Sequence, residues 1–184
     1  MSRLLVLTDR RLVPAGRSLA EVLRAVAAGG ASTVLLRESD LPDGPRAELA
    51  RSAQDAGLTV LAAHRPVPGC AGLHARAADP APVTGAWGRS CHDRVEVDRA
   101  AAEGASWATL SPFAATDSKP GHGPPVAASA FRGLRLPTYA LGGITPANAA
   151  AARAAGAHGV AVMGAVMRAE DPAAVVAALL REAG

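Results

Sequence analysis

The side chains best suited to acid–base chemistry stand where short apolar runs of this chain end. Histidine titrates closest to neutral pH, and four of the five histidines follow or end such runs, at His64, His74, His92 and His122. A neutral imidazole can take a proton from one atom of a ligand and return one to another. We expect His122 and His92 to be the acid–base residues, whereas His158 precedes its apolar run and belongs to the other end of the fold.

Groups able to hold an anion occupy similar positions. Of the 19 basic residues, 18 are arginine, and the one lysine, Lys119, offers a compact charge that suits a phosphate. Arg37 ends an apolar run and can form two parallel hydrogen bonds to a phosphate. Ser90 ends another run and can donate a hydrogen bond to a ligand oxygen. We expect Lys119 or Arg37 to stabilise negative charge during the reaction.

The segment 111–125 is a long polar loop rich in glycine and proline. It holds Thr116, Ser118, Lys119 and His122. Connections of this length inside a compact domain are usually functional, so we expect the loop to close over a bound ligand and bring its polar residues inward.

Two glycine turns near the end of the chain predict a phosphate site. Residues 139–146 and 159–165 each read as a short strand that runs into glycine and then into a helix. Thr145 is a good N-cap, and Pro146 sits at the first helical position, where its missing N–H costs nothing. Bare backbone N–H groups at such helix starts bind phosphate, and we expect an anion to lie against Gly143 and Gly164.

Strands and helices alternate along the whole chain, which predicts parallel strands joined by right-handed crossovers. Eight strands favour a compact (β/α)8 TIM barrel, an α/β fold, as a single domain over residues 1–184. A full barrel usually needs about 250 residues, and prolines and glycine at 65–69 exclude a third helix, so we expect that helix to be lost or much shortened. The expected strands are 4–8, 33–37, 59–63, 72–74, 86–90, 107–110, 139–141 and 159–162, and the expected helices are 18–28, 46–56, 95–103, 126–131, 146–155 and 172–181.

Composition narrows the class of protein and partner. No apolar run approaches the roughly 20 residues of a membrane span, and no signal peptide is visible, so we expect a cytoplasmic protein without a membrane partner. The net charge of +3 comes without a basic stripe and with only 3% aromatic residues, which argues against nucleic acid and favours a small anionic ligand. The composition leaves open whether the protein forms a homo-oligomer.

These pieces together resemble the thiamine phosphate synthase/TenI family over nearly the whole chain. The matching blocks are Leu7-Thr8-Asp9, Leu36-Arg37-Glu38, Gly88-Arg89-Ser90, Thr116-x-Ser118-Lys119-Pro120-Gly121, Leu141-Gly142-Gly143-Ile144-Thr145-Pro146-x-Asn148 and Gly156-Ala157-x-Gly159-Val160-Ala161-Val162-Met163. The resemblance implies a barrel that binds a thiazole phosphate at Gly142, Gly143, Met163 and Gly164. Its synthase branch joins that phosphate to a pyrimidine pyrophosphate with magnesium, through a dissociative displacement of pyrophosphate, whereas the TenI branch includes thiazole tautomerases.

The chain departs from both branches at defined positions. Ala63-His64 replaces an Asn-Asp pair whose Asp helps to bind magnesium in the synthases, and Ser39 replaces a strand-two lysine. Magnesium prefers carboxylate oxygens, which His64 does not supply. Where the tautomerases carry a loop histidine, this chain has Pro112.

From these departures we expect a TenI-like enzyme that binds a small heterocyclic phosphate and isomerises it by acid–base chemistry, with no metal or other cofactor. Three alternatives stay open. The first is a thiamine phosphate synthase with magnesium. The second is a metal-dependent hydrolase or lyase that uses His64, His74 and His92, and the third is an inactive protein that only binds the phosphate ligand.

Overall fold

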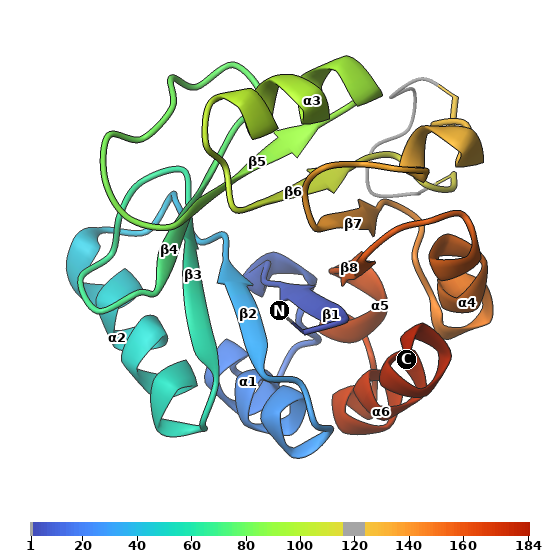
Figure 1. Ribbon diagram of the computed structural model, residues 1–184. Coiled ribbons are helices and arrows are strands. Elements are labelled where there is room, and N and C mark those ends of the chain that lie inside the picture. The colour runs from blue at the N-terminus through green and yellow to red at the C-terminus, as the bar shows by residue number, and fades with distance from the viewer. Residues whose placement is uncertain (1, 116–123) are drawn as a thin grey trace.

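Eight parallel strands form a closed barrel in the computed structural model, which describes residues 2–115 and 124–184. Each strand pairs with the next, and β1 pairs with β8 to close the ring, as Figure 1 shows. The strands are β1 (Leu4–Leu7), β2 (Thr33–Leu36), β3 (Thr59–Ala63), β4 (Gly72–Ala75), β5 (Trp87–Cys91), β6 (Trp107–Leu110), β7 (Thr138–Leu141) and β8 (Gly159–Val162). The predicted TIM barrel is therefore confirmed.

The helices are amphipathic or alanine-rich segments that bury one face against the strands. They are α1 (Leu19–Ala28), α2 (Asp43–Asp55), α3 (Arg94–Ala102), α4 (Pro146–Ala154), α5 (Gly164–Met167) and α6 (Pro172–Ala183), with 3-10 turns η1 (Arg10–Leu12) and η2 (Ala128–Phe131). Ser18 and Glu21 form a capping box at the start of α1, and Thr145 with Asn148 does the same at α4. These caps fix where each helix begins after its strand.

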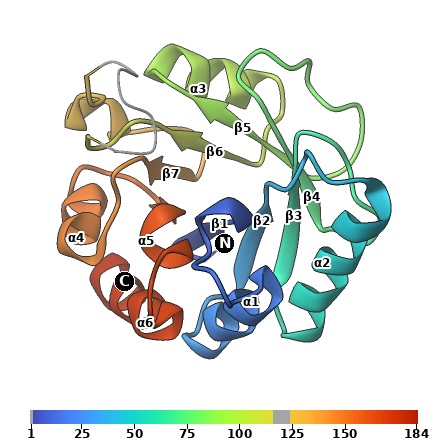
Figure 2. The same ribbon diagram turned by 180° about the vertical axis from the view of Figure 1, so that it is seen from behind.

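The helices cover the barrel unevenly. In both views α2, α1, α6 and α4 lie side by side as a belt over one half, and α3 packs separately on β5 and β6 (Figures 1 and 2). Neither the link between β3 and β4 nor the link between β4 and β5 contains a helix. The predicted loss of the third helix is confirmed, and the fourth is absent as well.

Three elements differ from the sequence-based expectation. The helix expected at 126–131 is only the 3-10 turn η2, because so short a segment without a side-chain cap cannot offset the cost of helix nucleation. Helix α2 begins at Asp43 rather than at residue 46, since Pro45 is tolerated in a first helical turn. The helix expected directly after the glycine turn at Gly164 is a single turn, α5, and the longer helix α6 follows it.

The barrel interior is filled by side chains rather than left open. The side chains inside the barrel are mainly apolar. The indole of Trp107 lies against Gly72 of β4 and Gly88 of β5. A Cβ at Gly88 would collide with this indole, and one at Gly72 would lie 3.0 Å from it, so both glycines make room for the ring. None of the helices within the described residues is long and apolar enough to cross a membrane.

Candidate functional site

A cavity of about 310 Å³ opens at the carboxyl ends of β7 and β8. This is the end of a TIM barrel at which active sites are built, and the loops after strands seven and eight are its usual phosphate site. The residues that line the cavity are Ala115, Leu141, Gly142, Gly143, Ile144, Thr145, Ala161, Val162, Met163, Gly164, Ala165 and Arg168. Four of the predicted binding residues, Gly142, Gly143, Met163 and Gly164, therefore lie together here.

The two glycines after β7 are needed for both conformation and space. Gly142 and Gly143 have φ angles of +96° and +64°, which residues with a Cβ seldom adopt. A Cβ at Gly143 would lie 2.5 Å from the carbonyl oxygen of Ala115 and 2.8 Å from that of Ala114. The segment after β6 is seated on this turn, because the Ala114 N–H donates to the Gly142 carbonyl at 3.0 Å.

Asn148 holds the same turn from the side of α4. Its amide Nδ2 donates to the Gly143 carbonyl at 2.8 Å, and its Oδ1 accepts from the Thr145 N–H at 2.9 Å. The turn and the start of α4 thus form one hydrogen-bonded unit beside the cavity.

Arg168 is a cavity residue that the sequence analysis missed. It follows α5, and its guanidinium folds back so that a Cβ on Gly164 would meet Nη1. A cationic group therefore lies beside the predicted phosphate position. The signal in the sequence was the four-residue spacing between Gly164 and Arg168, which places both on one side of a single helical turn.

Arg37 reaches across the barrel mouth. It follows β2, its N–H donates to Thr8 Oγ1 at 2.9 Å, and its guanidinium contacts the Met163 sulfur beyond β8. The side chain therefore reaches Met163, which lines the cavity, while Arg37 itself is not among the lining residues. The acidic residues near it serve a different purpose: Glu38 and Asp40 both accept hydrogen bonds from the Arg10 guanidinium, which lowers the pKa of Asp40 to about 2.

Ser90 belongs to a buried hydrogen-bond chain on the other side of the mouth. Trp107 Nε1 donates to His74 Nδ1 at 3.0 Å, and His74 Nε2 lies 3.1 Å from Ser90 Oγ. An indole N–H can only donate, so Nδ1 must accept and the neutral ring carries its proton on Nε2. Ser90 then accepts from His74, which leaves the serine hydroxyl proton free to donate elsewhere. Burial, with smaller effects of His64 and Arg37, lowers the pKa of His74 to about 3.

The four histidines within the described residues do not gather as one site. His92 is exposed, and its Nδ1 lies 3.3 Å from the Ser111 carbonyl oxygen, outside the lining of the cavity. His158 lies at the opposite end, where its Nδ1 is 3.2 Å from Arg3 Nη1. Thr116, Ser118, Lys119 and His122 lie outside the described residues, and with them the expected closure of their loop.

The alternative metal centre at His64, His74 and His92 does not fit the geometry. Both ring nitrogens of His74 already face Trp107 and Ser90. Across residues 2–115 and 124–184, no three His, Cys, Asp or Glu side chains come close enough together to hold a metal ion. The same finding applies to the magnesium that the family resemblance implies: in the described residues the donor set does not suit a hard cation.

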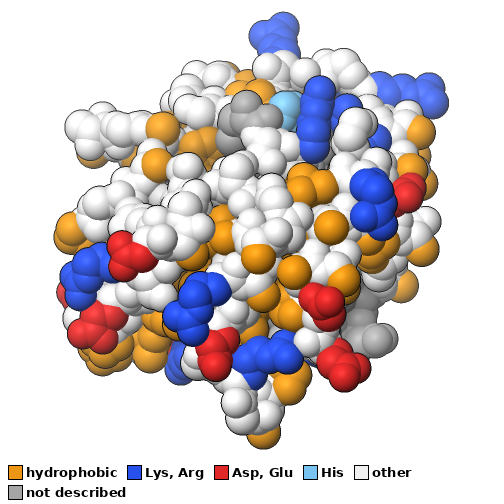
Figure 3. All heavy atoms as spheres, turned by 90° about the horizontal axis from the view of Figure 1, so that it is seen from below, with side chains coloured by type: hydrophobic (Ala, Val, Ile, Leu, Met, Phe, Trp, Pro, Cys, Tyr) orange, Lys and Arg blue, Asp and Glu red, His pale blue; other side chains and the backbone are white. Residues whose placement is uncertain are grey.

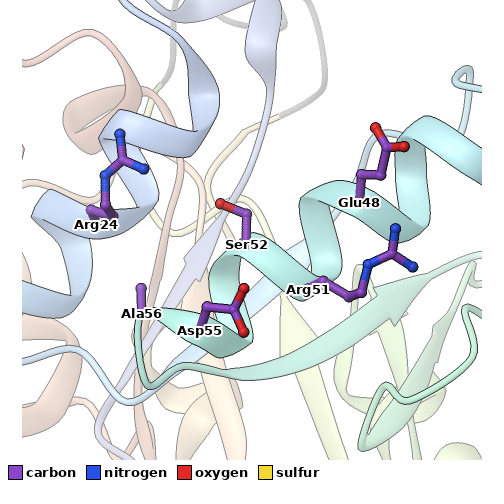
Figure 4. Close-up of a pocket in the computed structure, with 6 residues that line it drawn as sticks. All are labelled: Arg24, Glu48, Arg51, Ser52, Asp55 and Ala56. Atoms are coloured by element: carbon purple, nitrogen blue, oxygen red, sulfur yellow. The ribbon is translucent and has the colours of Figure 1, made fainter.

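A different kind of hollow lies on the outer surface of the described part of the chain. A second hollow, of about 340 Å³, lies between Arg24 of α1 and the carboxyl half of α2 (Figure 4). Helices of a barrel run against the strands, so this hollow is near the amino ends of the strands, away from the mouth. On the face shown in Figure 3, acidic and basic side chains are interspersed, without a continuous basic patch.

Comparisons with known proteins agree on one family. The profile described as thiamine monophosphate synthase matches residues 75–166. The chain is 37% identical to a thiamine-phosphate synthase of Moorella thermoacetica over 187 residues, which cover 91% of this chain and 89% of that protein. It is 36% identical to a thiamine-phosphate synthase of Methanoculleus marisnigri, with 96% and 92% covered. Among solved structures, thiamine phosphate pyrophosphorylase from Pyrococcus furiosus superposes with a TM-score of 0.83 at 23% identity, covering 98% and 95% of the two chains.

Proposed function

Because the chain belongs to the thiamine monophosphate synthase family, we propose that it is a transferase that joins a thiazole phosphate to a pyrimidine pyrophosphate. The sequence alone favoured isomerisation, with this transfer as the first alternative. The relatives named as synthases favour the transfer, and no comparison specifically favours the isomerisation.

The cavity at β7 and β8 carries this proposal. Its glycine turns present backbone rather than side chains, and Arg168 adds a guanidinium at its edge. A phosphate there would receive N–H groups from Gly143 and Gly164 together with a charge-assisted hydrogen bond from Arg168. The apolar residues Leu141 and Met163 border the same cavity and suit a heterocyclic ring.

In this reaction a thiazole nitrogen forms a bond to the methylene carbon of the pyrimidine, and the bond from that carbon to the pyrophosphate oxygen breaks. Pyrophosphate leaves with the bonding electrons. The chain's contribution is to hold the two rings in line and to stabilise the charge that develops on the leaving group. Arg37 and Ser90 border the mouth from β2 and β5, so a cation and a free hydroxyl proton are available for that charge.

Magnesium enters no step of this mechanism. The described residues near the mouth offer imidazole and guanidinium groups, and the nearby carboxylates of Glu38 and Asp40 are engaged by Arg10. Asp79, a carboxylate that faces His64, accepts a hydrogen bond from the Arg76 N–H at 2.8 Å.

Isomerisation of the thiazole phosphate is the second candidate. One observation favours it: burial together with Arg76 lowers the pKa of His64, and a neutral imidazole is the form that serves as a base. Both candidates need the same phosphate cavity, so they differ in the second substrate rather than in the first.

Pyrophosphate release separates the two candidates. The purified protein is supplied with thiazole phosphate and pyrimidine pyrophosphate, with and without magnesium, and both pyrophosphate and thiamine phosphate are measured. We expect the two products in equal amounts and only when both substrates are present. Formation of an aromatic thiazole from its tautomer, without pyrophosphate release, would instead establish the isomerase.

A further inference from the structure

Helix α5 carries Arg168 at its end, and this helix is too short to hold its own shape. It has four residues, Gly164–Met167, and a single helical turn does not offset the cost of its nucleation. Val166 and Met167 are fully buried and anchor one face of the turn. The end from which the Arg168 side chain returns to the cavity therefore depends on contacts from elsewhere in the chain.

Arg17 supplies such a contact from 152 positions earlier in the chain. Its guanidinium donates from Nη1 to the Ala169 carbonyl at 3.1 Å and from Nη2 to the Glu170 carbonyl at 2.9 Å. These are the two residues that follow Arg168. Carbonyl groups at a helix end have no partner within the helix, and the planar guanidinium can bridge two of them in a fixed geometry.

Arg17 is itself firmly placed. It directly precedes Ser18, which forms the capping box of α1 with Glu21, and its own N–H donates to the Pro14 carbonyl at 3.3 Å. Helix α1 packs against α2 and α6. Arg17 therefore links the first and the last strand–helix units of the barrel, next to the point where β8 pairs with β1.

The backbone of Arg168 is held on both sides. Its N–H donates to the Gly164 carbonyl at 3.1 Å. On its other side, the carbonyls of the next two residues are bound by Arg17. From this backbone the guanidinium of Arg168 folds back on Gly164 and lines the cavity. The direction of the Arg168 side chain is therefore tied to the hydrogen bonds that Arg17 makes.

The charge of Arg168 is available to a ligand. Within residues 2–115 and 124–184, no carboxylate forms an ion pair with Arg168 or with Arg17. An anion in the cavity can therefore take the Arg168 guanidinium as its partner. The strength of that charge-assisted hydrogen bond depends on geometry, so it depends on how firmly the Arg168 backbone is held.

We propose that Arg17 is a positioning residue of the cavity at β7 and β8: it holds the end of α5 so that the Arg168 guanidinium meets a bound phosphate. Arg17 does not touch the ligand, and it acts through backbone geometry rather than through its charge. The inference rests on the proposed function only for the ligand class, a phosphate monoester, because the thiazole ring takes no part in it.

A double-mutant cycle on phosphate affinity tests this coupling. Inorganic phosphate is titrated by NMR into the wild type, Arg17→Gln, Arg168→Gln and the double variant. We expect Arg17→Gln to weaken binding by about tenfold and the double variant to bind about as Arg168→Gln does, because a residue that acts through another adds no separate loss. Losses that multiply in the double variant, or a wild type that does not bind phosphate, would overturn the proposal.

Arg17→Lys separates position from charge. Lysine keeps the positive charge but cannot bridge two carbonyls. We therefore expect Arg17→Lys to bind phosphate as weakly as Arg17→Gln does. Wild-type affinity in Arg17→Lys would show that Arg17 acts through its charge, and the positioning role would be wrong.

Arg153→Gln is the matched control for stability. Arg153 is also half-buried, and it also binds two carbonyls, those of Ala157 and Ala183, at the end of α4 away from the barrel mouth. The variant should lose a similar amount of stability in urea unfolding while its phosphate affinity stays unchanged. An equal loss of affinity in Arg153→Gln and Arg17→Gln would reduce Arg17 to a stability residue.

Amide hydrogen exchange without ligand reports on α5 directly. The N–H groups of Met167 and Arg168 donate to the Met163 and Gly164 carbonyls. Arg17→Gln should speed their exchange by roughly tenfold, the equivalent of about one hydrogen bond, and Arg153→Gln should not. Unchanged exchange in Arg17→Gln would contradict the proposal. The synthase assay is separate: coupled losses of phosphate affinity in a protein that makes no thiamine phosphate would refute the proposed function and leave the role of Arg17 standing.

Discussion

The substitution Gly143→Ala tests whether the segment after β6 is seated on the phosphate turn. The chain contains a matched control, because Gly133 has nearly the same φ, +62° against +64°, but nothing lies within 4 Å of the position of its Cβ. Both alanine variants suffer the same backbone strain. Only Gly143→Ala also pushes a methyl group against the carbonyls of Ala114 and Ala115.

The expected magnitudes follow from these two contributions. A left-handed alanine costs about 1–2 kcal/mol, offset by about 0.4–1 kcal/mol because alanine restricts the unfolded chain more than glycine does. Gly133→Ala should therefore lower the free energy of unfolding by about 1 kcal/mol. Crowding against rigid backbone adds about 1–3 kcal/mol, so Gly143→Ala should lower it by about 2–4 kcal/mol.

Urea unfolding at equilibrium measures both variants, with unchanged m values as evidence that the unfolding transition is comparable. Gly143→Ala should also weaken the binding of thiazole phosphate by about tenfold or more, equivalent to one lost hydrogen bond of about 1.4 kcal/mol, while Gly133→Ala binds normally. Equal losses of stability in the two variants would show that the segment after β6 does not press on Gly143.

Three other outcomes are expected. In urea unfolding, Trp107→Phe should destabilise the protein by about 1–3 kcal/mol more than Trp87→Phe, because only Trp107 donates a hydrogen bond to the buried Nδ1 of His74. Similar losses of stability in the two variants would argue against the hydrogen-bond chain. In the folded protein His74 has a pKa of about 3, against an ordinary value of 6.5. Between these two pH values the unfolded state therefore binds a proton at His74 that the folded state does not bind. Wild-type stability should consequently fall between pH 6.5 and pH 3, by up to about 1.4 kcal/mol per unit, and His74→Gln should lessen that slope; an unchanged slope would mean that His74 is charged when folded. Arg168→Gln should weaken thiazole phosphate binding about 10- to 100-fold in calorimetry, whereas Arg181→Gln on exposed α6 should not, and indistinguishable affinities would remove Arg168 from the site.

The barrel could be predicted from local patterns because most strands are short apolar runs followed by glycine or a polar residue. The spans 59–63 and 107–110 match β3 and β6 at both ends. The position of the cavity at β7 and β8 was also readable, since Gly142, Gly143 and Gly164 are signals within single turns. The end of α5 at Met167 was not predicted, because Gly164–Met167 continues the apolar composition of β8 without a cap or breaker.

What the sequence did not reveal depends on residues far apart along the chain. Trp107 meets His74 across 33 positions, and Arg46 fixes a turn 17 to 19 positions away. No periodicity encodes such contacts. His92 and His64 looked alike as histidines after a strand, yet one is exposed and the other is held with a buried nitrogen. That difference comes from packing, which composition does not show.

The uneven helix cover has a consequence for local unfolding. The strands under the belt of α2, α1, α6 and α4 lose their apolar contacts only when several helices separate, whereas β4 is flanked by two links without a helix. Amide hydrogens of β4 should therefore exchange with solvent through small openings long before those of β1 and β8. His74 lies in β4, and the turn of His64 is hydrogen-bonded to it. The least covered part of the barrel is therefore where local opening can be followed most directly by hydrogen exchange.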